Sequence, residues 1–391
     1  MHCGIDTLAE QRFAILHCKR VGLVTNHTGV DGQGTRTADL LHQNPHVHLT
    51  QLFSPEHGLR GAVDAQVADA VDPRTGVPVA SLYGARLKPE PEHLQSLDAL
   101  VFDIQDAGVR FYTYISTLGL CLQAAAEAGI SFIVLDRPNP LGGYAIEGPM
   151  AQPHRLSFTA WHPIPVRHGM TVGELARLYN AELHLGADLT VVPCSRWKPH
   201  QWFHQTGVTW TGPSPNLETF LQTFLYPGMA LLEYTNVSVG RGTRAPFEQV
   251  GAPWMDGPRL ARHLNRLSIP NVRFLPVRFV PQRPPFFGET CCGVQVVVTR
   301  LPDTARRPYS CLRIGLELAA ALRDLFPEEW DASGFSHLLA NDAAYEAFRG
   351  GACYEELAAS WRPDEADFRL RREPYLLYTR VGSKGSILER D

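Results

Sequence analysis

Short apolar runs alternate with amphipathic stretches along the first half of the chain. A strand with both faces buried reads as a continuous apolar run, and a helix on the surface of a sheet shows an apolar stripe. The runs that predict strands span residues 21–24, 48–53, 79–83, 97–102, 130–135 and 189–193, and those that predict helices span 37–43, 115–128 and 171–183. This alternation predicts an α/β fold with a Rossmann-like, doubly wound and mostly parallel sheet.

The last of these helices has a clear predicted start. Thr171 is followed three residues later by Glu174, which is the spacing of a capping box. We therefore expect a helix to begin at residue 171.

The pattern changes after about residue 245. A helical stretch at 260–267 leads to a strand-like run at 272–280, and a proline-rich turn at 281–285 precedes an alternating run at 293–299 and a helix at 312–325. A chain of 391 residues is long for a single hydrophobic core. We predict a Rossmann-like catalytic domain over 1–247 and a smaller C-terminal α+β domain over 248–391.

Composition excludes several classes of protein. The chain is 44% hydrophobic and 19% charged, with a net charge of −4 and no basic stripe, so a nucleic-acid partner is not expected. No apolar run is long enough for a membrane span, and the N-terminus lacks the features of a secretory signal. The sequence as written predicts a cytoplasmic protein, and a secreted or periplasmic one if the start has been trimmed.

The eight cysteines show no zinc-site spacing. We expect free, buried thiols.

Polar residues cluster where predicted strands end. In a parallel sheet these ends lie on one edge, where α/β proteins bind ligands. The clusters bring together one set of candidate site residues: Asn26, Glu56, His57, Asp103, Gln105, Asp106, Arg110, Tyr112, Tyr114, Arg137 and Asn139.

Three later segments have the same polar character. They add a second set of candidates: Glu147, His168, Glu233, Asn236, Ser238, Arg241 and Thr243. Some have a structural alternative: a loop residue that accepts backbone N–H bonds at Glu147, an ion pair between Glu233 and Arg241, and a hydrogen-bonded anchor at His168. Aromatic residues that could stack on a sugar are Tyr83, Tyr112, Tyr114, Trp161, Tyr234 and Trp254, although packing in the core is favoured for any one of them.

The motifs for dinucleotide binding, P-loop phosphate binding, an α/β-hydrolase nucleophile and HExxH metal binding are all absent. A metal site made of His57, Asp103 and Asp106 is one alternative. Paired carboxylates favour glycoside hydrolysis, which uses one carboxylic acid and one carboxylate. Glu56 fits an acid or base role, and burial in an apolar turn could raise the pKa of Glu147.

The chain resembles the NamZ family of exo-β-N-acetylmuramidases, formerly DUF1343 and now glycoside hydrolase family 171. The motifs that carry the resemblance lie at residues 53–58, 81–84, 102–114, 135–140, 147–149, 165–176, 213–216, 238–243, 246–247 and 251–253. The resemblance implies release of terminal, non-reducing N-acetylmuramic acid from peptidoglycan fragments, without a cofactor, in a cleft between two domains. Glu56 best matches a catalytic carboxylate, and Glu147, His57 and Asp106 complete the predicted catalytic set.

Two other functions stay open at this point. One is a non-catalytic muropeptide or sugar-binding protein that uses the same cleft. The other is a metal-dependent hydrolase.

Overall fold

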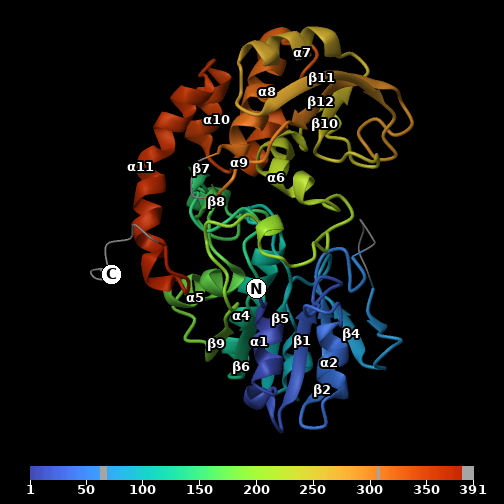
Figure 1. Ribbon diagram of the computed structural model, residues 1–391, viewed down its shortest axis with the longest axis vertical. Coiled ribbons are helices and arrows are strands. Elements are labelled where there is room, and N and C mark those ends of the chain that lie inside the picture. Colours follow the sequence, from blue (N-terminus) through green and yellow to red (C-terminus); the bar gives the residue numbers. More distant parts are fainter. Residues whose placement is uncertain (62–67, 306–308, 381–391) are drawn as a thin grey trace.

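The computed structural model describes residues 1–61, 68–305 and 309–380. Figure 1 shows two lobes, with the N-terminal segments below and the later segments above. The end of the predicted C-terminal domain, 381–391, lies outside the described residues.

The lower lobe is built on a mostly parallel sheet, as the sequence predicts, and the sheet has seven strands. Its strands are β1 (Arg20–Thr25), β2 (His48–Ser54), β3 (Ala70–Val71), β4 (Pro78–Ser81), β5 (Ala99–Asp103), β6 (Ser131–Leu135) and β9 (Leu189–Val192), of which β3 was not predicted. They lie in the order β3-β4-β2-β1-β5-β6-β9, and all neighbours are parallel except β3 and β4. All five residues of β5 are buried, which explains why its first four, Ala99 to Phe102, are apolar.

The helices of this lobe are α1 (Gly4–Glu10), α2 (Thr37–Gln43), α3 (Pro91–Leu94), α4 (Tyr114–Ala128) and α5 (Val172–Glu182). Three of them, α2, α4 and α5, match predicted helices, whereas α1 and α3 were not predicted. The Thr171 hydroxyl accepts the N–H of Glu174, and the Glu174 carboxylate accepts the N–H of Thr171, so the predicted capping box is confirmed.

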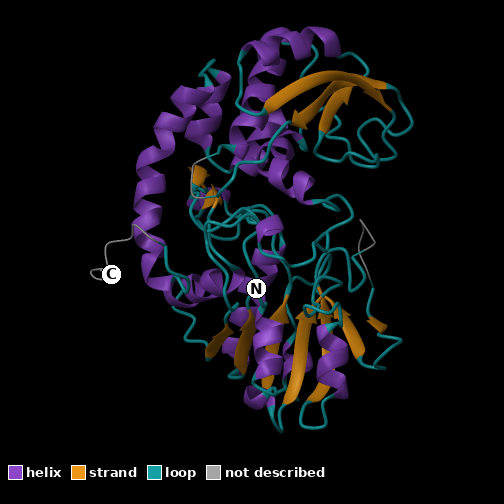
Figure 2. Cartoon of the chain, in the orientation of Figure 1, coloured by secondary structure: helices purple, strands orange, loops and turns teal. Residues whose placement is uncertain are grey.

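The direction in which successive strands are added to the sheet reverses at β1. From β1 the chain runs outward through β2 and β4, and then returns to place β5 on the other side of β1. Figure 2 shows the strands ending at the loops that fill the middle of the molecule. The crevice outside the carboxyl ends of such strands is where ligands bind in open α/β sheets.

The upper lobe contains a three-stranded antiparallel sheet in the order β10-β12-β11. The elements of this lobe are α6 (Phe220–Met229), η4 (Ala230–Leu232), β10 (Gln249–Ala252), α7 (Gly257–Arg266), β11 (Val272–Phe279), β12 (Cys291–Val298) and α8 (Cys311–Leu325). Helix α6 lies upstream of the predicted boundary after residue 247, yet it packs on α8. A Cβ on Gly315 would lie 2.0 Å from the Gly228 carbonyl oxygen, so the two helix backbones touch.

The remaining elements are η1 (Ala14–Leu16), which lies in the lower lobe before β1, and β7 (Glu147–Met150), η2 (Pro153–Arg155), β8 (Pro165–Arg167), η3 (Phe203–Gln205), η5 (Ser333–Phe335), α9 (Ser336–Leu339), α10 (Asp342–Arg349), α11 (Tyr354–Arg372) and η6 (Glu373–Tyr375). Figure 1 shows α11 running along one side from the upper lobe down to α5. Among the described residues, no helix combines the length and apolar character that a bilayer crossing needs.

Candidate active site

A cavity of about 410 Å³ lies between the sheet edge and the upper lobe. The loops after β2, β4 and β5 form one side, and the segment from α6 to β10 forms the other. Its lining is Glu56, His57, Tyr83, Phe111, Tyr112, Thr113, Thr159, Ser214, Tyr226, Glu233, Tyr234, Arg241, Phe247 and Leu338. Five predicted site residues therefore meet here: Glu56, His57, Tyr112, Glu233 and Arg241.

Glu56 lies in the turn directly after β2. The Thr113 hydroxyl donates to Glu56 Oε2 at 2.6 Å. The Tyr114 hydroxyl lies 3.4 Å from the Glu56 carbonyl oxygen and donates to the Pro213 carbonyl at 2.7 Å. The next residue, His57, has a φ of 71° and is buried, which turns the chain sharply beside the carboxylate. The Glu56 side chain is thereby held at the cavity wall.

Glu233 provides a second carboxylate in the same cavity. Arg241 Nε lies 2.6 Å from Glu233 Oε1, so the ion pair considered from the sequence is present. Arg241 is 35% exposed and Glu233 is 13% exposed, so the guanidinium reaches further into the open space. Together with Glu56, the pair places one positive group and two carboxylates around one cavity.

The loop that carries Arg241 has its own internal bonds. Gly240 and Gly242 have φ angles of 83° and 74°, which favour glycine. The Ser238 hydroxyl accepts the N–H of Gly240, and the Thr243 hydroxyl donates to the Gly240 carbonyl at 2.6 Å. Ser238 and Thr243 were predicted to bind substrate, and the structure shows them shaping this loop instead.

Aromatic rings form much of the cavity wall. Tyr226 packs edge-on against Tyr112 and Phe247, with ring centroids 5.8 Å and 4.8 Å away. Burial raises the pKa of Tyr112 and of Tyr226 well above the ordinary value, so both phenols stay neutral. Tyr234, in contrast, is 51% exposed, and its ring stacks against His337. The cavity wall therefore contains both buried rings, at Tyr112 and Tyr226, and a half-exposed ring, at Tyr234.

Asp103 and Arg137 lie outside this cavity. Arg137 Nε donates to Asp103 Oδ1 at 2.6 Å, and both side chains are buried. Arg137 lines a second cavity of about 770 Å³, together with Gln105 and residues of α1. Their predicted contact with substrate is thus replaced by an ion pair that ties the end of β5 to the end of β6.

Glu147 also lies elsewhere. Arg167 Nη1 donates to Glu147 Oε2 at 2.8 Å, and the Ser310 hydroxyl contacts Glu147 Oε1. Both Glu147 and Arg167 line a third cavity, beside α11. Glu147 therefore does not share a cavity with Glu56, whereas Glu233 does.

Arg110 was expected to bind the substrate, and the structure corrects this. Its side chain is fully buried, and its Nη atoms donate to four backbone carbonyls, those of Pro149, Ile164, Leu338 and Leu339, at 2.7–3.1 Å. Burial lowers the pKa of Arg110 to about 9. Since Leu338 lines the cavity, Arg110 supports its wall from behind.

Asp106 and His168 are buried away from the cavity. Asp106 Oδ2 accepts the Gly108 N–H at 2.7 Å and lies 3.7 Å from His168 Nε2. Burial raises the pKa of Asp106 to about 7 and lowers that of His168 to about 3. Neither side chain lines the cavity, so the predicted catalytic role of Asp106 and the predicted substrate contact of His168 are not supported.

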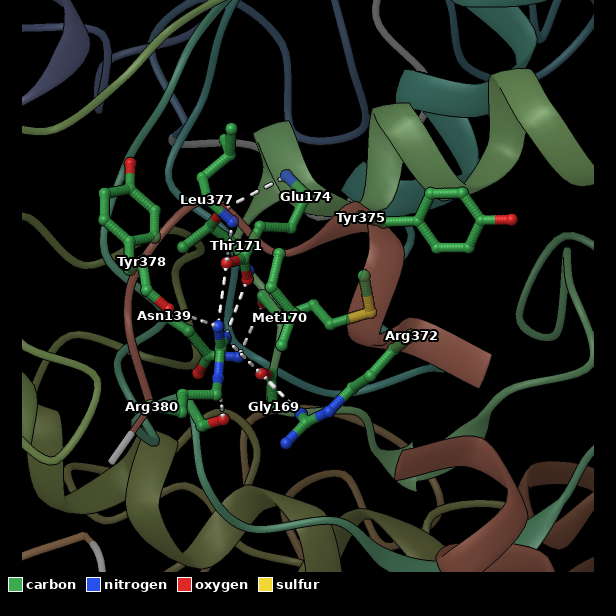
Figure 3. Close-up of polar contacts among 12 residues, drawn as sticks. Asn139, Gly169, Met170, Thr171, Glu174, Arg372, Tyr375, Leu377, Tyr378 and Arg380 are labelled. Atoms are coloured by element: carbon green, nitrogen blue, oxygen red, sulfur yellow. Dashed lines mark hydrogen bonds and ion pairs between the residues drawn. The ribbon is translucent and has the colours of Figure 1, made fainter. Parts of the chain in front are cut away.

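The end of α11 and the segment that follows it cover this region. Arg372 Nη1 donates to the His168 and Gly169 carbonyls, both at 2.7 Å, and Arg380 pairs with Glu174 at 2.8 Å. Figure 3 shows these side chains gathered around Gly169 and the start of α5. The carbonyls of residues 168 and 169 thus anchor Arg372 and Arg380, which agrees with the structural alternative considered for His168.

The remaining predicted residues form hydrogen bonds within loops. Asn26 accepts from the Thr28 N–H and hydroxyl, and Asn139 donates to the Met170 carbonyl. Gln105 donates to two carbonyls, and Asn236 bridges to the segment at 329–331. Trp161 and Trp254 pack against Tyr179 and Phe326.

The described residues contain no group of side chains that would support the alternative of a metal site. Within residues 1–61, 68–305 and 309–380, no set of three or more His, Cys, Asp and Glu side chains is placed to hold an ion. His57 lines the first cavity, whereas Asp103 is engaged by Arg137. The three residues considered from the sequence are not brought together.

Comparison with known proteins agrees with the resemblance. The family described as exo-beta-N-acetylmuramidase NamZ, N-terminal, matches residues 21–221, and its C-terminal counterpart matches 224–378. This chain belongs to the NamZ family. Peptidoglycan beta-N-acetylmuramidase NamZ of Bacillus subtilis (strain 168) is 44% identical over 382 residues, covering 96% of this chain and 91% of that protein.

Two solved structures of DUF1343 family proteins from Bacteroides fragilis NCTC 9343 have the same fold. The first is 38% identical with a TM-score of 0.88, covering 97% of this chain and 99% of the other. The second is 33% identical with a TM-score of 0.77, covering 96% and 98%. The two-lobed arrangement is therefore common to these proteins.

Several cavity residues of this NamZ family member were not predicted from the sequence. Thr113 and Phe111 lie inside the most polar motif, but no single residue there signals contact with Glu56. Ser214 and Phe247 lie in motifs that carry the family resemblance. Tyr226 has no polar signal, because it is an aromatic residue within the apolar helix α6.

Proposed function

We propose that this chain hydrolyses the β-glycosidic bond of terminal, non-reducing N-acetylmuramic acid in peptidoglycan fragments. The observation that carries the proposal is the pair of carboxylates, Glu56 and Glu233, on the wall of one cavity. Similarity to the Bacillus subtilis peptidoglycan β-N-acetylmuramidase over nearly the whole chain supports the substrate class.

Glu56 is the principal acid–base residue in this proposal. Its carboxylate is fixed by Thr113, and it lies on the sheet edge where the loops of the two lobes meet. General acid or base catalysis is typically worth ~10²–10⁴-fold in rate. Glu233 is the second carboxylate, and Arg241 holds it at one oxygen.

Arg241 is the selectivity residue in this proposal. N-acetylmuramic acid carries a lactyl ether with a carboxylate, which N-acetylglucosamine lacks. A guanidinium binds a carboxylate through two parallel hydrogen bonds. Because Arg241 uses Nε for Glu233 and remains partly exposed in the cavity, its outer edge is suited to that carboxylate.

The mode of action follows from the cavity wall. Buried rings at Tyr112, Tyr226 and Phe247 close one part, and the exposed Tyr234 lies in the open part. The proline-rich turn supports the wall, since the Gln282 N–H donates to the Gly242 carbonyl at 3.2 Å. Such a cavity admits one terminal sugar, so we expect single N-acetylmuramic acid units as product.

Substitution of Glu56 tests the proposal. Glu56→Gln should keep the fold and lose at least ~100-fold in kcat on a β-N-acetylmuraminide, while the substrate still binds. Glu92→Gln is the matched control, because Glu92 is exposed on α3. If the wild-type protein bound the fragments without turnover, it would be a sugar-binding protein instead. If Glu56→Gln kept more than about a tenth of wild-type kcat, the assignment of Glu56 as the acid–base residue would be rejected.

Product analysis on a defined oligomer tests the mode of action. The expected products are the monosaccharide and a chain shortened by one unit. Early release of fragments of intermediate length would show that the cavity is open at both ends.

A further inference from the structure

Residues 2–3 and 194–195 form a short antiparallel pair at the end of β9. His2 and Ser195 exchange both backbone hydrogen bonds, from His2 N to Ser195 O at 3.1 Å and from Ser195 N to His2 O at 2.9 Å. In an antiparallel ladder the next pair along is a non-hydrogen-bonded one, whose residues face each other closely. That next pair is Cys3 and Cys194.

The backbone contacts of the two cysteines agree with this register. The Cys3 N–H points to Asp6 Oδ2 at 2.8 Å, and the Cys194 N–H points to the Tyr378 hydroxyl oxygen at 2.8 Å. Both N–H groups thus face away from the partner strand, and the two side chains lie on one face. Both residues are buried, at only 2% and 5% exposed.

We propose that Cys3 and Cys194 are a dithiol that closes to a disulfide bond, in which Cys3 attacks the oxidant and Cys194 resolves the mixed disulfide. Directly opposed residues of a non-hydrogen-bonded pair have Cα atoms roughly 4.5 Å apart, within the range of about 4.4–6.8 Å that disulfides span. The bond would therefore form without rearrangement of the backbone. This proposal is independent of the sugar chemistry.

The surroundings distinguish the two sulfurs. Cys3 lines the second cavity, of about 770 Å³, beside Arg137, and Cys194 is not among the residues that line it. The neighbouring Cys194 thiol and the positive charge of Arg137 lower the pKa of Cys3. Burial raises the pKa of Cys194, whose thiol donates to the Asp136 carbonyl oxygen at 3.1 Å. A thiolate is the attacking form, so Cys3 reacts first.

The reaction balances with a low-molecular-weight disulfide, RSSR, as the oxidant. The Cys3 thiolate attacks one sulfur of RSSR, forms a Cys3–SR bond and releases RS⁻. Cys194 then loses its proton to that RS⁻, and its sulfur attacks Cys3 Sγ, releasing the second RS⁻, which takes up a proton from water. Two protein thiols are oxidised, and one RSSR is reduced to two RSH.

Peptide mapping without reduction tests the proposal on the full chain. After treatment with hydroxyethyl disulfide, the wild type should yield a linked pair of peptides containing Cys3 and Cys194. Cys194→Ser should trap the reagent on Cys3, whereas Cys3→Ser should leave Cys194 unmodified. The exposed Cys18 and Cys353 should carry the reagent equally in all three proteins, which controls for its delivery.

Thermal unfolding provides the second measurement. The closed bond spans residues 3–194 and restricts the unfolded chain, so the oxidised protein should melt several degrees higher than the reduced one, and dithiothreitol should reverse the change. A wild type that keeps the reagent on Cys3 without the link would overturn the proposal. The proposal would also be overturned if Cys3 stayed unreacted while Cys18 and Cys353 were modified. The same holds if the reagent modified Cys194 in Cys3→Ser at the rate seen for Cys3, or if the linked protein melted at a lower temperature than the reduced one.

Discussion

Thr113 donates a hydrogen bond of 2.6 Å to the carboxylate of Glu56, although the two residues are 57 positions apart. Thr113 directly precedes α4, and its side chain does not cap that helix. The hydroxyl is therefore free to orient Glu56, which follows β2. The segments that follow β2 and β5, the two neighbours of β1 in the sheet, are thus joined by this side-chain contact.

Removal of this hydroxyl should impair turnover without unfolding the protein. Thr113→Val keeps the shape of the side chain, and a hydrogen bond to a charged group is worth about 1.5–3 kcal/mol, so we expect kcat to fall ~10–100-fold. Thr113→Ser keeps the hydroxyl and should retain most of the activity. Steady-state kinetics with thermal unfolding as a control checks this, and equal activity of the Val and Ser variants would show that the contact has no catalytic role.

Selectivity for the muramic sugar should depend on Arg241. Arg241→Ala should lower kcat/KM on a β-N-acetylmuraminide by ~10–100-fold, because a charged hydrogen bond of about 1.5–3 kcal/mol is lost, and should affect the corresponding N-acetylglucosaminide much less. Arg241→Lys keeps a charge beside Glu233 but not the two-pronged geometry, so it should also lose selectivity. Arg244→Ala, on the exposed side of the same loop, is the control. Equal losses on both substrates would assign Arg241 a structural role only.

Arg110 should contribute to stability rather than to substrate binding. Arg110→Met leaves four backbone carbonyls without their donor, which should cost on the order of 3 kcal/mol or more in the free energy of unfolding. Arg262→Met, at an exposed position on α7, should cost little. Urea unfolding measures both, and an Arg110→Met protein of wild-type stability with a raised KM would contradict this assignment.

Asp106 should make stability depend on pH. An unfolded aspartate releases its proton near pH 3.9, whereas burial raises the pKa of folded Asp106 to about 7. Between these values the unfolded state binds fewer protons, so rising pH favours unfolding and the contribution of Asp106 to stability falls. Asp106→Asn removes this contribution. The stability of Asp106→Asn relative to wild type should therefore increase from pH 4.5 to 7.5, by on the order of a few kcal/mol.

Urea unfolding of Asp106→Asn and of the wild type at pH 4.5 and pH 7.5 tests this prediction. A difference between variant and wild type that stays constant would show that Asp106 ionises in the folded protein as it does in the unfolded one.

The sequence by itself determined the parallel sheet and the edge at which the site lies. Buried strands such as β5 and β6 need apolar residues on both faces, so their runs are visible without any tertiary information. The capping box of α5 is equally local, since it joins residues three apart. Glu56, His57, Tyr112, Glu233 and Arg241 were selected on local patterns and do line the cavity.

Only the tertiary structure decided which polar residues face the cavity. Asp103 and Glu147 resemble Glu56 in sequence, but each is engaged by an arginine more than fifteen positions away, Arg137 and Arg167. A buried charge must find a partner, and that partner can come from any part of the chain. Arg110 illustrates the same point, because two of the carbonyls it binds belong to Leu338 and Leu339. Local sequence marks where polar groups concentrate, and long-range pairing decides which of them remain available to a substrate.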